Sequence, residues 1–313
     1  MSEKHQLIFQ PGLIVNQEFY DYPALKESAK NWLHLLKYRF GTGEFYGRND
    51  GIQLNHLQFG HSERHEGSMF KGYSPKDCLT IGILQKNSGR VCVNHLKMEL
   101  NDIIVIDDSK PYDFVSSHAT LLALISIHKP LVEQEIPWLL HATDKKFTDN
   151  NGLLSKTIEY EWERILKEPT LIENDHEIDM IEKKITQAIQ NALEGQTGHI
   201  SHLTKGEITA FEVKDFLLDS LKENISIQSI SDQFNVSDRT LSNSFKSLFG
   251  MTPKHFIKLL KLNHTHEDLQ LADPKTTNVS DIALKWGFLH FSRFSKEYKS
   301  LFGVLPSETL MKT

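Results

Sequence analysis

A pentapeptide, Lys-Ser-Leu-Phe-Gly, occurs twice in the last quarter of the chain, at 246–250 and 299–303, 53 residues apart. Each copy closes a stretch whose pattern predicts a helix, a tight turn and a second helix, and a proline follows three residues past each glycine, at Pro253 and Pro306. Self-similarity of this kind is typical of one supersecondary unit that is used twice. The sequence therefore predicts two tandem units of the same fold.

Each unit is predicted to consist of two short helices. In the first unit the pattern predicts helices over 227–234 and 237–249, and in the second unit over 281–286 and about 290–302. Matching apolar positions are offset by 52 residues before the turn and by 53 after it. One extra residue therefore lies in the second turn.

The turns place two demands on the sequence. A small residue is needed where the helices cross, and a residue that tolerates positive φ is needed four positions later. Ser231 and Asn235 meet these demands in the first unit, and Ala283 and Gly287 meet them in the second. The serines expected to cap helix N-termini are Ser226, Ser237 and Ser280.

A long helix, predicted over 254–271, joins the two units. At 1.5 Å rise per residue it spans roughly 27 Å, against roughly 34 Å for one turn of a DNA duplex. Two helices held at its ends can therefore enter adjacent major grooves on one face of DNA. An amphipathic helix over 212–223, with Leu217 on its buried side, precedes the first unit.

The part of the chain before these units is predicted to be rich in strands. Short apolar runs alternate with turn-rich pieces between about 51 and 128, a pattern typical of a barrel or sandwich. Residues 25–40 have an amphipathic helical pattern, which places Trp32, Tyr38 and Arg39 in the core or at its rim. The predicted strands are 52–59, 78–84, 90–93, 103–106, 112–115 and 121–127.

Helices are predicted to follow the strands, over 130–141, 153–166 and 175–193. In the last of these, apolar residues recur at spacings of 3, 4, 3 and 4, the a/d pattern of a coiled-coil seam. We expect this seam to join two subunits; the alternative is that it packs on the strands of its own chain. The seam consists of Ile178, Ile181, Ile185, Ala188 and Ala192. The glycine-containing stretch 195–206 is interpreted as a linker.

The two cysteines, Cys78 and Cys92, are expected to be reduced thiols. If their strands form a hairpin that turns near residues 87 and 88, Cys92 faces Ile83 and Cys78 faces Lys97. The two sulfur atoms then do not meet, which suits a reducing compartment. A redox switch is the alternative.

Length, composition and charge limit the class of protein. The 313 residues suffice for two domains. The chain starts without an apolar signal-peptide core, and the longest apolar run, 121–127, is too short to span a bilayer, so we expect a cytoplasmic protein without membrane association. From residue 212 onward there are 13 Lys and Arg against 12 Asp and Glu, compared with 22 against 29 before it. Any nucleic-acid contact must therefore come from a few placed cations, helped by dimerisation.

Both units carry the same marks of a known family. In the first these are Ile230, Phe234, Val236, Ser237, Leu241, Phe245, Lys246, Phe249, Gly250 and Pro253, and in the second Ile282, Ala283, Trp286, Gly287, Phe288, Phe294, Ser295, Tyr298, Lys299, Phe302, Gly303, Pro306 and Ser307. With these residues the segment 227–306 resembles the bipartite DNA-binding domain of the AraC/XylS transcription regulators. The chain departs from the family pattern in the connecting helix, at Lys261, His264 and Asp268, and His290 replaces the usual acidic cap of the last helix.

The outward faces of the two second helices are the candidate DNA-reading surfaces. Arginine reads guanine and asparagine reads adenine through paired hydrogen bonds, and an exposed phenylalanine contacts a thymine methyl. The first face presents Arg239, Ser242, Asn243 and Lys246. The second presents Phe291, Ser292, Ser295 and Lys296, with Arg293 and Lys299 as phosphate contacts, and Phe291 folding back into the core is the alternative for that residue.

Histidines and carboxylates gather in the strand region and raise the alternative of a metal enzyme. They are His56, His61, His65, Glu63 and Glu66. Ligands on one strand face must lie two residues apart, and the spacing of these five residues does not give the His-x-His pair followed by Glu that cupin enzymes use. We therefore expect no metal, no cofactor and no catalytic activity.

These observations predict an α+β chain in three parts. Residues 1–170 form a β-barrel-like, cupin-like sensor domain with helices, 171–206 a dimerisation helix and linker, and 207–313 an all-α domain with two helix-turn-helix units. The expected function is that of a homodimeric regulator that binds promoter DNA and senses a small molecule with residues that the sequence does not identify. The family resemblance implies contact with RNA polymerase, and hence activation. The alternatives are a ligand-independent regulator and a cupin-type metal enzyme fused to a DNA-binding domain.

Overall fold

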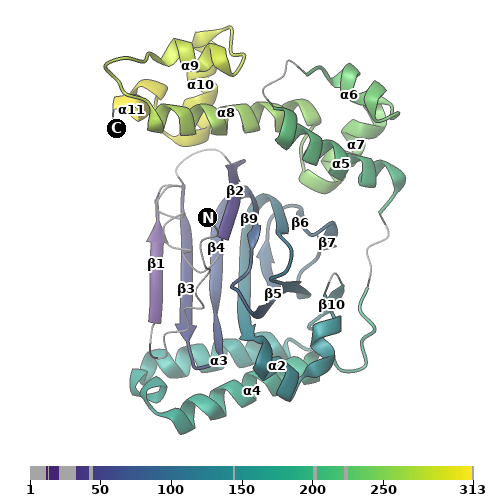
Figure 1. Cartoon of the computed structure of the whole chain (residues 1–313), viewed down its shortest axis with the longest axis vertical. Helices are drawn as coiled ribbons and strands as arrows, with labels where there is room; N and C mark the ends of the chain where they lie inside the picture. Colours follow the sequence, from purple (N-terminus) through teal and green to yellow (C-terminus); the bar gives the residue numbers. More distant parts are fainter. Residues whose placement is uncertain are drawn as a thin grey trace.

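The structure is a computed structural model that describes residues 12, 14–20, 33–41, 45–143, 145–199, 203–221 and 225–311. A sheet-rich domain lies between two helical layers (Figure 1). Helices α3 (Leu153–Lys167) and α4 (Asp175–Leu193) cover its lower end, and a helical C-terminal domain, described over 205–221 and 225–311, lies across its upper end.

The described strands form one antiparallel sheet in the order β1-β3-β4-β9-β5-β8-β10. β2 pairs with the second half of β4, and β6 pairs with both β7 and β9. The strands are β1 (Ile14–Phe19), β2 (Leu33–Arg39), β3 (Gly47–Gln53), β4 (Leu57–Tyr73), β5 (Cys78–Asn87), β6 (Val91–Val93), β7 (Leu96–Met98), β8 (Asp102–Asp107), β9 (Tyr112–His128) and β10 (Lys146–Thr148). Within the described ranges β1 and β10 end the path without pairing to each other, so a mixed α/β architecture is confirmed but closure into a barrel is not.

Several predicted strand boundaries are wrong. β4 runs without a break past the predicted strand end at residue 59, β9 joins two predicted strands, and β7 is not among the predicted strands. Gly60 and Gly67 explain the first error, because a Cβ at either position would come within 2.4 Å of a backbone oxygen of a neighbouring strand. These glycines allow close approach of strands and do not mark turns.

The helix predicted over 25–40 is also wrong over its described part, which forms strand β2 from Leu33 to Arg39. Trp32 lies outside the described residues. The predicted register of the cysteines is wrong as well, since Cys92 is paired with Lys97 and Val115 and not with Ile83. Cys78 and Cys92 are nevertheless free and buried.

The remaining elements are helical. They are α2 (Lys129–Glu135), the 3-10 turns η1 (Pro137–His141) and η2 (Pro169–Glu173), α5 (Lys205–Ser220), α6 (Ile227–Gln233), α7 (Asp238–Phe249), α8 (Pro253–Leu271), α9 (Val279–Lys285), α10 (Phe291–Phe302) and α11 (Pro306–Met311). Helix α5 starts seven residues before the predicted 212 because Thr204 and Glu207 form a capping box there. The described linker is accordingly shorter than predicted.

The seam of α4 is covered by its own chain. Ile178, Ile181, Ile185 and Ala188 are at most 5% exposed and belong to one apolar core with β5 and β9, while Ala192 is partly buried against it. The sequence pattern thus describes a helix that packs on the sheet, the arrangement kept as the alternative. A role of these residues in dimerisation stays a prediction.

Replacing Ile185 with alanine tests this packing. Because the side chain is fully buried within one chain, Ile185→Ala should lower the free energy of unfolding by about 2–5 kcal/mol at any protein concentration. Met180→Ala, on the exposed side of the same helix, is the control and should change little. Urea unfolding with light scattering measures both. A stable monomer of Ile185→Ala beside a wild-type dimer would instead assign the seam to a subunit contact.

Candidate nucleic-acid interface

Both helix-turn-helix units have the predicted backbone. Asn235 and Gly287 turn the chain with φ of 49° and 80°, and Gly250 and Gly303 end the second helices in the left-handed region. The positions of Asn235 and Gly287 confirm the predicted turns, and a left-handed glycine at the end of a helix is a common C-cap.

The caps of the second unit differ from prediction. Asn278, not Ser280, caps α9, because its side-chain oxygen accepts a hydrogen bond from the Asp281 N–H at 2.9 Å. His290 occupies the N-cap of α10 and makes no side-chain cap bond, whereas Ser237 caps α7 by accepting from Thr240 N–H at 3.1 Å. The N-terminus of the outward-facing helix therefore has a side-chain cap in the first unit and none in the second.

The apolar residues of each unit lie inward as predicted. Leu241, Phe245 and Phe249 are completely buried, and Phe294 and Tyr298 are at most 1% exposed. Aromatic contacts join them within each unit, with ring centroids 5.0 Å apart for Phe245 and Phe249. The opposite faces are thereby left on the surface.

The structure leaves the predicted reading faces open. Phe291 is 42% exposed, which rules out the alternative that it folds back into the core. Arg293 donates to Glu297 at 3.1 Å, and Glu297 also accepts from Lys258 of α8 at 3.0 Å, so this arginine is held along its own helix. The exposed members are Arg239, Asn243, Lys246, Phe291, Ser292, Arg293, Lys296 and Lys299, and the half-buried ones are Ser242 and Ser295.

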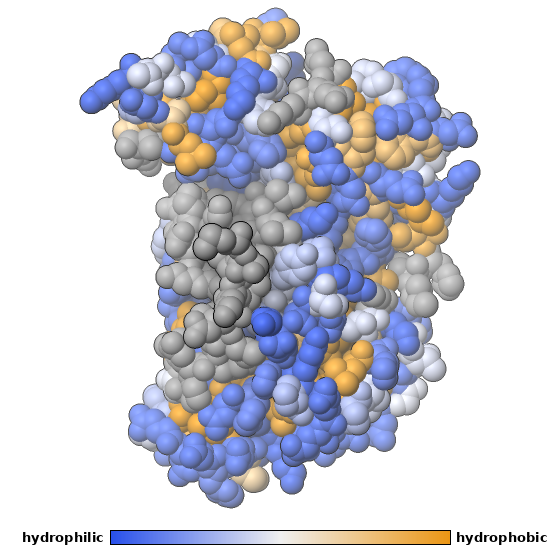
Figure 2. Space-filling view, viewed as in Figure 1, coloured by the Kyte–Doolittle hydropathy of each residue, from blue (hydrophilic) through white to orange (hydrophobic). Residues whose placement is uncertain are grey.

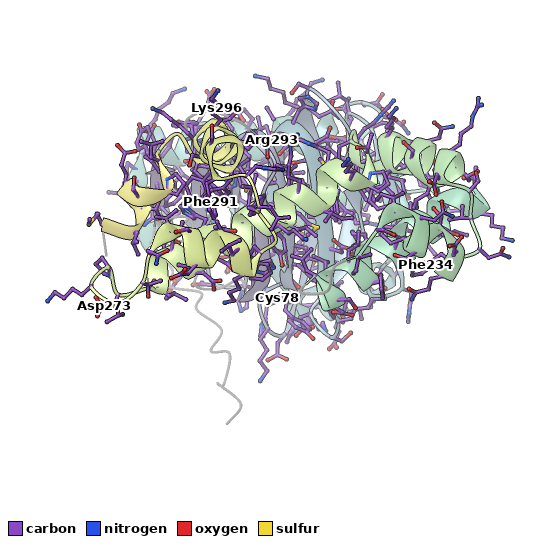
Figure 3. All side chains as sticks on the ribbon, turned by 90° about the horizontal axis from the view of Figure 1, so that it is seen from above. Cys78, Phe234, Asp273, Phe291, Arg293 and Lys296 are labelled. Atoms are coloured by element: carbon purple, nitrogen blue, oxygen red, sulfur yellow. The ribbon has the colours of Figure 1, made fainter. Side chains whose placement is uncertain are left out.

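Helix α8 carries the two units at opposite ends. Seen from above, it crosses the view, with Phe291, Arg293 and Lys296 of the second unit on one side and Phe234 of the first on the other (Figure 3). Its 19 residues span roughly 28 Å at 1.5 Å rise per residue. One turn of a DNA duplex, for comparison, is roughly 34 Å.

The unusual residues of α8 hold the second unit in place. The His264 ring stacks on Trp286 with centroids 4.7 Å apart, and Asp268 accepts hydrogen bonds from Trp286 Nε1 at 2.6 Å and Lys285 Nζ at 2.8 Å. His266 contacts the buried Tyr298 hydroxyl at 2.5 Å. The departures from the family pattern at His264 and Asp268 thus have a packing role.

Strand β2 attaches the sheet to the middle of α8. The Arg39 N–H donates to Asn263 Oδ1 at 2.8 Å, and Asn263 Nδ2 donates back to the Arg39 carbonyl at 2.8 Å. On either side, the Tyr38 hydroxyl lies 3.1 Å from His264 Nε2, and the Phe40 ring packs edge-on against Phe256. Sequence analysis missed this attachment because it placed Tyr38 and Arg39 in a helix.

The first unit and α5 share an apolar core with the sheet. Met69, Cys92 and Val115 belong to the same buried cluster as Phe245 and Phe249. Two ion pairs lie beside it: Lys214 of α5 with Asp113 of β9, and Lys97 of β7 with Glu207 of α5. Lys214 is fully buried, and burial lowers its pKa.

A buried ion pair lies beneath the β2 attachment. Arg39 and Glu66 are 3% and 7% exposed, with Arg39 Nη2 2.7 Å from Glu66 Oε2 and Arg39 Nε 2.6 Å from Oε1. Burial raises the pKa of Glu66 to about 7, although the guanidinium of Arg39 acts in the opposite direction. Charge on Glu66 is therefore costly, and the arginine offsets only part of this cost.

The histidines considered as metal ligands are engaged elsewhere. His56 bonds Glu182 of α4 through its N–H at 2.6 Å and its ring at 3.0 Å, His61 lies 3.6 Å from Glu159, and His65 contacts Glu63 at 3.1 Å. Glu66 is taken up by Arg39. Within the described residues, His, Cys, Asp and Glu form no group of three or more that is placed to hold a metal ion.

Comparison with known proteins concerns mainly the C-terminal domain. Residues 230–312 match the family described as a helix-turn-helix domain. The chain is 37% identical over 107 residues to the XylDLEGF operon transcriptional activator of Pseudomonas putida, covering 34% of this chain and 33% of that one. It is 38% identical over 96 residues to a probable thc operon regulatory protein of Rhodococcus erythropolis, covering 31% and 29%. The chain thus spans about a third of the length of these curated relatives.

Among solved structures, the AraC-like transcriptional activator CuxR is similar with 16% identity and a TM-score of 0.40, over 72% of this chain and 82% of that one. The matched sequence and the geometry of α6 to α10 define a tandem helix-turn-helix DNA-binding domain. The C-terminal domain is of the AraC/XylS type.

As for membranes, not one of the helices in the described parts combines the length and the apolar character needed to cross a bilayer.

The Glu66 pKa gives the stability a defined pH dependence. Its value of about 7 in the folded chain lies above the ordinary 4.5, so its contribution to stability is full below about pH 4.5 and is lost as the pH rises through about 7. Glu66→Gln should therefore show a smaller fall in the free energy of unfolding across this window than the wild type. Urea unfolding at a series of pH values measures the difference. Glu163→Gln, at an exposed ion pair of α3, should keep the wild-type slope, and equal slopes for wild type and Glu66→Gln would contradict the assignment.

Proposed function

We propose that this chain is a promoter-binding transcription activator whose two helix-turn-helix units read adjacent major grooves. The observation that carries the proposal is the pair of outward faces on α7 and α10, each opposite a fully packed apolar face, at the two ends of one rigid helix. The names of the curated relatives, which describe operon activators and regulators, support the direction of regulation.

The two faces divide the work of recognition. On α7 the exposed Arg239 and Asn243 suit guanine and adenine, and Lys246 suits a phosphate. On α10, Ser292, Ser295 and Lys296 face the second major groove. Arg293 and Lys299 contact the phosphates of the DNA backbone. Because the domain carries little net positive charge, these few contacts supply most of the affinity.

We further propose that the sheet-rich domain senses a small molecule and that the protein acts as a homodimer in contact with RNA polymerase. The support for sensing is the set of contacts from β2 to Asn263 and His264, through which a rearrangement of the sheet would move α8 and both units. The α4 seam packs on its own sheet, and its part in the dimer contact stays a prediction.

Loss of one exposed cation on each face tests DNA reading. Arg239→Ala should weaken binding to a mapped operator by about 5-fold to 160-fold, the cost of about 1–3 kcal/mol for a bidentate base contact. Lys296→Ala should weaken binding and lower the slope of log affinity against log salt by about 1 if it holds a phosphate. Fluorescence anisotropy measures both. Lys167→Ala, an exposed lysine of α3 on the opposite side of the sheet, is the control, and unchanged affinity for both test variants would sink the assignment.

The sensing role predicts that a bound effector changes operator affinity. Native mass spectrometry of the purified full chain identifies co-purified small molecules, and anisotropy with and without them should show a change of about 5-fold to 150-fold. Asn263→Ala, which breaks the contact with β2, should reduce that change, and Asn191→Ala on α4 should not. If no small molecule alters the affinity, the chain is a ligand-independent regulator.

A further inference from the structure

The one extra residue of the second unit can be identified in the structure. Gly287 and Phe288 correspond to Asn235 and Val236, since the first of each pair turns the chain with positive φ and the second is partly buried in the core. His290 corresponds to Ser237, because each is the N-cap of the outward helix. The residue left over is Leu289.

Leu289 is 73% exposed, although leucine is an apolar side chain. The preceding residue, Phe288, is packed inside the unit, against Phe294 with ring centroids 4.9 Å apart. The insertion therefore adds an apolar side chain to the surface and not to the core.

Phe291 lies two residues further on, in the first turn of α10, and is 42% exposed. Aromatic neighbours are found for Phe288 and Phe294, but none for Phe291 within the part of the chain that the structure describes. The equivalent position of the first unit is Asp238. An exposed apolar pair is thus a property of the second unit alone.

The surroundings of this pair favour nucleic acid over protein as its partner. Arg293 and Lys296 follow within the next five residues, both exposed, and Phe291 lies on the same helix as these two cations (Figure 3). Hydrophobic surface appears at the upper edge of the molecule over the α9–α10 unit, bordered by hydrophilic surface (Figure 2). Two apolar side chains among cations are too small an area for a protein interface, but they suit one or two methyl groups in a groove lined by phosphates.

We propose that Leu289 and Phe291 contact the 5-methyl groups of thymines in the major groove entered by the second unit. The inference rests on the proposed function and adds a division of chemistry: the first unit reads bases by hydrogen bonds, and the second reads thymine by apolar contact. The start of the outward helix is the part that reaches base edges in helix-turn-helix complexes. An insertion directly before it extends the reading surface by one side chain.

Replacing thymine by uracil removes only the methyl group and leaves the base pair intact. Each thymine of a mapped operator is exchanged for uracil in turn, and the affinity of the full-length protein is measured by anisotropy. We expect a loss of about fourfold at each contacted thymine, because burying one methyl group is worth about that factor. For each of the variants Leu289→Ala and Phe291→Ala, one of these uracil substitutions should no longer change the affinity, because the side chain that contacts that methyl group is gone.

The controls separate this inference from general effects. Leu271→Ala removes an 85% exposed leucine at the end of α8 and should keep the full uracil sensitivity. Arg239→Ala should weaken binding to the operator and should also keep the full uracil sensitivity. Thermal unfolding of Leu289→Ala and Phe291→Ala should match the wild type, since both side chains are exposed.

The failures are distinguishable. An operator that binds tightly but shows no sensitive thymine, or a sensitivity that persists in both alanine variants, overturns the inference and leaves the proposed function standing. A protein that binds no promoter sequence overturns both.

Discussion

The apolar core shared by the sheet and the first helix-turn-helix unit determines where everything above the sheet lies. Met69, Cys92 and Val115 are buried together with Phe245 and Phe249, so α7 cannot move without exposing this surface to water. Helix α8 follows directly from α7 and is attached a second time through Asn263. The second unit depends on α8 through His264 and Asp268. The positions of both outward faces therefore depend, through these contacts, on one buried apolar cluster between the two domains.

The sequence predicted the second half of the chain well because its pattern is local. Positive-φ residues and the 52-to-53 offset act within a few residues, and Asn235 and Gly287 have the expected backbone. The exposed faces followed from the same helical period. The insertion was predicted from the offset alone, but its identity as Leu289 required the exposed fractions of side chains in the turn.

The first half was predicted less well because its determinants are not local. β2 has a helical pattern, but its pairing with β4 and the Asn263 clamp on its backbone decide its structure. Glycines in β4 looked like turn residues, although they relieve contacts with strands that are distant in sequence. The α4 seam has the same 3-4 spacing whether it meets a second subunit or its own sheet, so period alone could not choose between them. Ion pairs such as that of Arg39 and Glu66 leave no sequence signal.

The buried Lys214 has a consequence for how freely such domains can be exchanged. Its ammonium group is fully enclosed and is compensated by Asp113 from the other domain and by Asp215, 3.1 Å away on the same helix. A chimera that joins this helical domain to a foreign sensor would remove one of the two carboxylates that compensate this charge, unless the new sensor supplies a carboxylate at the same place. The helical domain therefore cannot be exchanged between proteins without regard to the sheet surface that it contacts. Among related sequences, substitutions at Asp113 and at Lys214 are expected to occur together.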